Sequence, residues 1–210
     1  WNWDYQFSSG GSKFADLNKL GVNLEYYPEN LLTQCYIADK QQAVPIGTTG
    51  KVFFWNKTTF DQAGLEIPKT IDDLLNAGKV FQEKLGDDYY PMAMYQYERM
   101  ILMLYYLGSK YDMNWVVDGK PQYSVEQVKE GLDWLCSLED AHVLPTITML
   151  QGDGATILEK NAKWGNGRYA GFYEWDSANQ KMKDALEPGQ EFVVGDFLTG
   201  IGDHTAGLTK

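Results

Sequence analysis

The chain has 210 residues, of which 44% are hydrophobic and 22% charged, a composition that excludes intrinsic disorder and permits a sizeable core. Its 18 Lys and Arg against 29 Asp and Glu give a formal net charge of −11. A charge of this sign argues against nucleic acid and an anionic membrane surface as partners, because both require a positive protein surface.

Cysteine and aromatic content restrict the protein further. Two Cys, at positions 35 and 136, are too few for a disulfide framework or a zinc cluster. We expect both to be buried apolar side chains, with one bridge between them as the alternative. The longest apolar run, residues 100–107, is far too short to span a membrane. Seven Trp and fourteen Tyr exceed what a core needs, so many must lie partly at the surface.

The first fifty residues predict only short elements. Residues 14–20 have apolar residues at helical spacing and stop at Gly21, and a second short helix is expected after Pro28. Residues 43–47 read as a strand entry interrupted by proline. The following run, KVFFWN at residues 51–56, is β-branched and aromatic, and it predicts a buried strand.

The remainder alternates helices with strands. Thr70 and Asp73 resemble a capping box that opens a helix over residues 70–85, and Ser124 with Gln127 forms another. The predicted helices are therefore 70–85, 99–107, 124–141 and 157–163, and the further predicted strands are 92–95, 168–173 and 191–197. Alternation of this kind predicts an α/β fold.

Motifs for catalysis, metals and cofactors fail on their spacing. GTTGK at residues 47–51 and GNGRYAG at residues 165–171 do not match the phosphate loop or the dinucleotide fingerprint. DMNWVVDG at residues 112–119 reads as a hairpin turn at Asp118-Gly119 rather than a calcium loop. His142 and His204 have no partners at metal-ligand spacing, and no nucleophile elbow is present. We therefore expect no catalytic residue, metal or cofactor.

Three clusters combine aromatic rings with short hydrogen-bonding side chains. A sugar requires this combination, because its C–H faces stack on rings while its hydroxyls bond to carboxylates and amides. The alternative is that these are ordinary core and rim aromatics with solvated neighbours. The clusters are Trp1, Trp3 and Tyr5 around Asp4 and Gln6; Tyr95 and Tyr97 around Gln96 and Glu98; and Tyr173 and Trp175 around Glu174 and Asp176.

Residues 44–86 resemble the extracellular solute-binding proteins of bacterial ABC importers, of the maltose-binding, carbohydrate-uptake type. The resemblance rests on VPIG at the hinge, FWNK in the next strand, FDQAGL in a turn and PKTIDDL opening a helix. Ile71 and Asp73 stand where that family usually has Trp and Glu. Residues 14–21, 124–144 and 166–175 resemble further stretches of the family in the same order.

The resemblance implies a periplasmic-binding-protein-like (type II) lobe, a three-layer α/β/α arrangement with a mixed central sheet. Residues 1–47 would be a remnant of lobe one and the hinge entry, 48–197 lobe two, and 198–210 a return strand toward lobe one. Because family members are considerably longer, we expect the chain to be an internal segment.

The resemblance also implies the function and the site. The intact protein would capture a carbohydrate, an oligosaccharide in our interpretation, between two lobes and deliver it to transmembrane permease subunits, outside the cytoplasm as a cell-surface lipoprotein or in the periplasm. Trp175 would be the stacking platform. The other expected ligand-binding residues are Trp1, Trp3, Asp4, Tyr5, Gln6, Thr49, Tyr97, Glu98, Arg99, Glu174 and Asp176. The alternatives are a glycoside hydrolase using Glu98 and Glu174, and a binder of polyamines or other cations.

Overall fold

The computed structural model of the protein describes residues 7–117 and 120–200, and the chain divides into two compact units, Trp1–Thr48 and Thr49–Lys210. This division lies one residue from the predicted boundary between residues 47 and 48. The assignment of the units to two lobes of a binding protein stays a prediction.

The first unit is made of short elements. It contains η1 (Leu17–Leu20), α2 (Glu29–Leu32), η2 (Thr33–Cys35), β1 (Tyr36–Ile37) and β2 (Lys40–Gln41). As predicted, Gly21 ends the first of these, in the left-handed conformation with φ +72°. The two strands pair antiparallel around Ala38 and Asp39, which both have positive φ, as a tight two-residue hairpin turn requires. The strand expected at residues 43–47 is not formed.

The second unit is built on a three-stranded antiparallel sheet. The central strand β3 (Lys51–Asn56) pairs with β6 (Gly171–Trp175) on one side and with β7 (Phe192–Gly195) on the other. The predicted strand at residues 51–56 is confirmed, whereas the one expected from residue 168 begins at Gly171. In the part of the chain that the structure describes, parallel pairing is limited to single bridges, Thr70 with Thr199 and Tyr90 with Tyr169. Within the described residues, the mixed character of the predicted sheet rests on these bridges.

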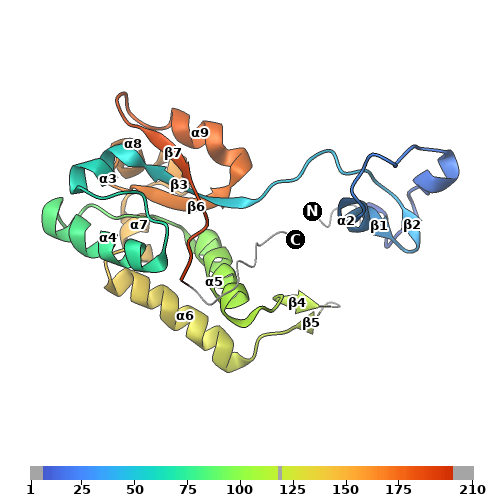
Figure 1. Ribbon diagram of the computed structural model, residues 1–210, viewed down its shortest axis with the longest axis horizontal. Helices are drawn as coiled ribbons and strands as arrows, with labels where there is room; N and C mark the ends of the chain where they lie inside the picture. The colour runs from blue at the N-terminus through green and yellow to red at the C-terminus, as the bar shows by residue number, and fades with distance from the viewer. Residues whose placement is uncertain (1–6, 118–119, 201–210) are drawn as a thin grey trace. The chain divides into compact units, whose positions relative to one another are not determined.

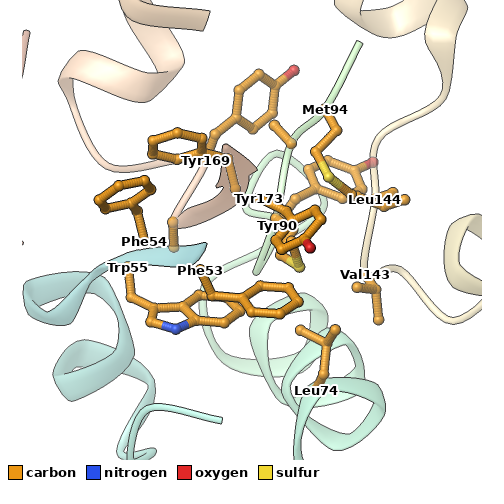
Figure 2. Packing of buried hydrophobic residues seen from close by; sticks show 14 of the residues in the cluster. Phe53, Phe54, Trp55, Leu74, Tyr90, Met94, Val143, Leu144, Tyr169 and Tyr173 are labelled. Carbon is orange, nitrogen blue, oxygen red and sulfur yellow. The ribbon is translucent and has the colours of Figure 1, made fainter. Parts of the chain in front are cut away.

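The alternation of β3 divides the core into two faces. Phe54 lies on one face, where its ring stacks on Phe172 at 4.9 Å and on Phe192 at 5.3 Å between centroids. Phe53 and Trp55 lie on the opposite face, as Figure 2 shows. Because both faces of the strand are apolar, each must be covered by other elements, as in sheets with helices on both sides.

Helices cover both faces of the sheet (Figure 1). Trp164 of α8 packs edge-on against Phe172, with α9 beside it, whereas Tyr105 of α5 contacts Phe53 on the other face. The helices of this unit are α3 (Lys57–Ala63), α4 (Ile71–Lys84), α5 (Gln96–Tyr111), α6 (Val125–Asp140), α7 (Ile147–Gly152), η3 (Leu158–Lys160), α8 (Ala162–Gly165), η4 (Asp176–Ala178) and α9 (Asn179–Asp184).

Both predicted capping boxes are present. Thr70 and Asp73 exchange side-chain and backbone hydrogen bonds at the start of α4, and Ser124 and Gln127 do the same for α6. The helix α5 is longer than predicted and passes through Gly108, which is buried beside the hydroxyl of Tyr123. Gly108 does not end the helix, because the residues packed around it keep the backbone on the helical path.

Several expectations differ from the structure. Residues 92–95 form no strand, although the backbone N–H of Ala93 donates to Gly171 of β6 at 2.8 Å. The helix expected at residues 157–163 is divided into η3 and α8 because Asn161 caps the second piece. Cys136 is exposed rather than buried, since α6 turns Gly131 and Leu138 toward the core.

The hairpin expected at residues 118–119 has β4 (Val116–Val117) as its first strand and β5 (Lys120–Pro121) as its second, and the two pair antiparallel. Its turn residues lie outside the described part of the chain. Within residues 7–117 and 120–200, no helix combines the length and the apolar character that crossing a membrane would require.

Candidate functional site

The candidate site begins where β3 starts and β6 ends. The antiparallel register pairs Lys51 directly with Trp175, so the two strand ends lie at the same edge of the sheet. The chain remains paired beyond the strands, because the backbone N–H of Asp176 donates to Gly50 at 2.9 Å. The hydroxyl of Thr49 donates to the carboxylate of Asp176, and both of these residues are exposed. The register thus fixes four polar and aromatic side chains at one edge.

The ammonium of Lys51 is enclosed at this edge. Its side chain is only 1% exposed, and Nζ lies 2.7 Å from Oε1 of Glu174. Three rings surround the same nitrogen, with centroids at 4.9 Å for Trp175, 5.5 Å for Tyr97 and 6.0 Å for Tyr173. A buried ammonium is unfavourable without a counter-charge, and here a carboxylate and ring faces together replace its water.

Glu174 is held at two points. Its Oε1 accepts hydrogen bonds from Lys51 Nζ and from the backbone N–H of Trp175, both at 2.7 Å. These bonds fix the carboxylate and, within the described part of the chain, leave Oε2 without a bonded donor. An ionised carboxylate of this kind is a pre-positioned acceptor for a ligand O–H or N–H.

A pocket of about 270 Å³ adjoins this cluster and shares Tyr97 and Glu174 with it. Its walls come from residues 93–98, residues 156–159, strand β6 and helix α9. Apolar side chains form much of the lining, namely those of Ala93, Met94, Ile157, Leu158, Phe172 and Met182. The aromatic and polar lining residues are Tyr95, Tyr97, Glu98, Thr156, Glu159, Glu174 and Lys181.

Hydrogen bonds hold the wall at residues 156–159. The hydroxyl of Tyr95 donates to the carbonyl of Ala155 at 2.9 Å. Just before it, Asp153 accepts from the Tyr169 hydroxyl at 2.5 Å and from Asn161 at 3.1 Å, and it pairs with Lys163 at 3.0 Å. Burial raises the pKa of Asp153, but these three partners outweigh it, so the pKa lies below its ordinary value. The carboxylate therefore stays ionised and the wall stays anchored near neutral pH.

Negative charge predominates in the pocket. Glu98, Glu159 and Glu174 line it together with one cation, Lys181. Lys181 lies 2.8 Å from Glu159 and is paired with it. Burial raises the pKa of Glu159, but the hydrogen bond from Lys181, a backbone hydrogen bond and the nearby positive charges of Lys181 and Lys160 together outweigh burial and lower the pKa below its ordinary value. Among the described residues, no group of three or more His, Cys, Asp and Glu side chains is arranged to hold a metal ion.

The structure gathers six of the predicted site residues at this edge and its pocket: Thr49, Tyr97, Glu98, Glu174, Trp175 and Asp176. Trp1, Trp3, Asp4, Tyr5 and Gln6 lie outside the described residues, so their role stays a prediction.

Arg99, also predicted to contact ligand, has a different place. Its side chain is 8% exposed, and the guanidinium donates to the carbonyls of Met94 and Pro145 and to the carboxylate of Glu139. Through these three hydrogen bonds, Arg99 ties α5 to α6 and to the loop that follows it. We therefore assign it to the framework of the fold rather than to the ligand-contacting surface.

Two parts of the site were not predicted. The sequence pattern predicts Lys51 only as the first residue of a buried strand, although a charged residue opening such a strand is itself a signal for a buried ion pair. Residues 156–159 and Lys181 match no sequence motif, and only the folding of the chain brings them to the pocket.

Comparison with known proteins decides the family. The family described as bacterial extracellular solute-binding protein matches residues 5–206 of the chain. The chain belongs to this family. The resemblance predicted from residues 44–86 is therefore confirmed, and so is an α/β fold of the periplasmic-binding-protein type.

Solved structures support the same assignment for this solute-binding protein. A periplasmic solute-binding protein from Pectobacterium atrosepticum is 36% identical, with a TM-score of 0.86, over 95% of the chain and 51% of its own. A periplasmic oligogalacturonide-binding protein from Yersinia enterocolitica is 34% identical, with a TM-score of 0.84, over 94% of the chain and 50% of its own.

A de novo designed cysteine esterase, which is an engineered protein, is 35% identical, with a TM-score of 0.86, over 94% of the chain and 50% of its own. The chain thus spans about half the length of these structures. No curated protein matches the chain significantly.

Proposed function

We propose that the protein is the substrate-binding component of an ABC importer, which captures an oligosaccharide between two lobes and delivers it to the membrane permease. The observation that carries this proposal is the placement of Tyr97 and Trp175 around the Lys51–Glu174 pair beside an open pocket. Membership of the extracellular solute-binding family and 34% identity to an oligogalacturonide-binding protein support it.

The chemistry of the edge suits a sugar ring. Trp175 and Tyr97 offer ring faces on which the C–H face of a pyranose can stack, and the carboxylates of Glu174, Glu98 and Asp176 accept hydroxyl hydrogen bonds. A volume of about 270 Å³ is slightly below the usual range for pockets that enclose a whole ligand. We infer that this unit supplies one wall of a larger cleft, which a hinge rotation closes over the ligand.

The same proposal makes the protein a carrier rather than an enzyme. The competing hypothesis, a glycoside hydrolase using Glu98 and Glu174, requires one carboxylic acid poised to donate a proton and a second carboxylate opposite it. Glu174 instead is hydrogen-bonded to an ammonium and to a backbone N–H, an arrangement that favours a fixed acceptor. We expect no reducing-sugar release from candidate glycans. Release that is abolished by Glu174→Gln would establish the hydrolase.

Location and delivery follow from the family. A solute-binding component meets its ligand outside the cytoplasm, so we place the protein in the periplasm or on the cell surface as a lipoprotein. Its protein partners are the transmembrane permease subunits of the importer.

Calorimetry of the full-length protein against panels of oligosaccharides and polyamines tests the proposal. We expect saturable binding of an oligosaccharide, and a loss of about tenfold or more in affinity for Trp175→Ala because a stacking surface is removed. Val194→Ala, at an exposed position on β7, is the matched control and should bind as the unsubstituted protein does. Binding of polyamines alone would contradict the proposal and favour a cation carrier.

A further inference from the structure

We propose that the subsite bounded by Tyr97, Glu98 and Glu174 takes an uncharged sugar unit and discriminates against a uronic acid. This inference rests on the proposed carbohydrate function and names the class of sugar that this part of the site accepts. It also distinguishes the chain from the Yersinia protein, whose structure was solved in complex with digalacturonic acid.

Among the described residues, the one lysine that lines the pocket and the buried lysine behind Glu174 are already paired. Lys181 is bound to Glu159 at 2.8 Å, and Lys51 is bound to Glu174 at 2.7 Å. Arg99, the next cation along the chain from Tyr97, is bound to Glu139 and to two backbone carbonyls. A sugar carboxylate would have to displace a protein carboxylate to gain any of these partners.

The ammonium of Lys51 is not accessible to a ligand. The Lys51 side chain is 1% exposed, and its ammonium lies within 5.5 Å of the ring centroids of Tyr97 and Trp175. A ligand that stacks on these rings is separated from the ammonium by the rings themselves and by Glu174. The charge of Lys51 therefore holds Glu174 in place instead of meeting the ligand.

The charge that a ligand meets in the pocket is negative. The pocket is lined by three carboxylates and one ammonium, a formal charge of −2, or −1 when Lys51 behind Glu174 is added. Like charges within a few ångströms repel, more strongly at a partly buried site than in bulk water. A sugar hydroxyl, in contrast, donates a hydrogen bond to these carboxylates.

Matched pairs of sugars test this inference with the full-length protein. Each pair is a neutral oligosaccharide and its uronic acid counterpart, with galactobiose against digalacturonic acid as the first pair and cellobiose against cellobiuronic acid as the second. Affinities are measured by calorimetry at low ionic strength, where surface charge is least screened. We expect the neutral member to bind roughly tenfold more tightly in every pair that binds.

Variants that each remove one carboxylate charge test whether that charge causes the preference for neutral sugars. Glu174→Gln keeps the shape of the side chain and an oxygen that can accept from Lys51, so it should weaken binding of the neutral sugar roughly tenfold and strengthen binding of the uronic acid. Glu98→Gln leaves the Lys51–Glu174 pair intact and should also reduce the ratio of the affinity for the neutral sugar to that for the uronic acid. This second variant keeps the inference testable if Glu174→Gln fails to fold. Glu83→Gln removes one charge on the exposed side of α4 and should change neither affinity.

Each outcome is decisive. Equal or tighter binding of the uronic acid by the unsubstituted protein would overturn the inference while leaving carbohydrate capture in place. An unchanged preference in both Glu174→Gln and Glu98→Gln would overturn it as well. Failure of every pair to bind would contradict the proposed function itself, and the inference with it.

Discussion

The indole of Trp55 occupies the space that a side chain at Gly171 would need. A Cβ added at position 171 would lie 2.3 Å from Cε3 of Trp55, and one at Gly195 would lie 2.2 Å from its Nε1. Trp55 is fully buried on the central strand, and these two glycines belong to the strands on either side of it. The flat ring thus lies across three strands, which is possible because both neighbours lack side chains.

The first prediction concerns this packing. Gly171→Ala should lower the free energy of unfolding by about 1–3 kcal/mol, because the added methyl group must displace a fully buried ring in a close-packed core. Gly152→Ala is the control, since nothing lies within 4 Å of a Cβ at that position of α7. The control should stay within about 1 kcal/mol of the original protein. Urea unfolding measures both variants, and equal stabilities would show that the core around Trp55 can expand freely.

The second prediction separates the framework role of Arg99 from a ligand role. Arg99→Met should destabilise the fold by roughly 2–4 kcal/mol, because it leaves the carboxylate of Glu139 and two buried carbonyls without their donor. Arg168→Met removes an arginine that is 42% exposed and lies 3.4 Å from Asp88, and it should cost less than about 1 kcal/mol.

Thermal unfolding gives the stabilities, and sugar titration well below the midpoint gives the affinity of the folded fraction. If Arg99→Met abolished binding with stability unchanged, the residue would be returned to the ligand-contacting set.

Some features of the fold could be predicted from the sequence because they depend only on nearby residues. Strand β3 and the capped starts of α4 and α6 were predicted because each depends on neighbours within three or four residues. Thr70 needs only Asp73 to cap its helix, and KVFFWN needs only its composition to be buried on both faces. Local rules of this kind are visible in one sequence.

What could not be predicted depends on contacts between distant segments. The family resemblance implies that Arg99 lies in the cleft with the rest of the loop at residues 95–99, whereas the packing of α5 on α6 brings it to Glu139, 40 residues away. Lys51 and Glu174 are 123 residues apart, and the antiparallel pairing of β3 with β6 makes them diagonal neighbours, since Lys51 pairs with Trp175 and Glu174 pairs with Val52. Cys136 lies among the apolar residues of α6 in the sequence, yet it is exposed. The side of α6 that packs closely is the one that carries Gly131, where an added Cβ would meet Met103 and Leu107.

A third prediction concerns acid stability. Glu130 accepts hydrogen bonds from Lys110 and from the hydroxyls of Tyr111 and Tyr106, and these bonds lower its pKa from 4.5 to about 2. A carboxyl whose pKa is lower in the folded state stabilises the fold above its unfolded pKa of 4.5. This contribution is lost as the pH falls from about 4.5 to about 2. Because the side chain is 33% exposed, we expect roughly 1 kcal/mol rather than the full value of the shift.

Glu130→Gln isolates this contribution. The difference in unfolding free energy between the original protein and the variant should be constant above pH 5.5 and should shrink toward zero near pH 2, because Gln does not titrate. Urea unfolding at intervals between pH 7 and pH 2 measures the difference. A difference that stays constant over this whole range would mean that the cluster does not lower the pKa of Glu130.

The last prediction compares this chain with a two-lobed protein of the length of its solved relatives, of which the chain spans about half. A two-lobed binder encloses its ligand so that both faces of the sugar leave water, whereas under our proposal the unit described here would offer one wall, with Trp175 and Tyr97. One stacking contact and a few partly exposed hydrogen bonds contribute on the order of 2–3 kcal/mol, against an association cost of at least about 4 kcal/mol.

The 210-residue chain should therefore bind its sugar only at millimolar concentrations or more weakly, while the full-length protein binds at micromolar ones. Titration of both with the same oligosaccharide, followed by Trp fluorescence, measures the difference. Trp175→Phe in both backgrounds shows whether the signal comes from the candidate platform, because the phenyl ring preserves stacking while the indole emission is lost. Equal affinities of the two proteins would mean that the complete binding surface lies within these 210 residues, and that enclosure by a second lobe adds nothing to capture.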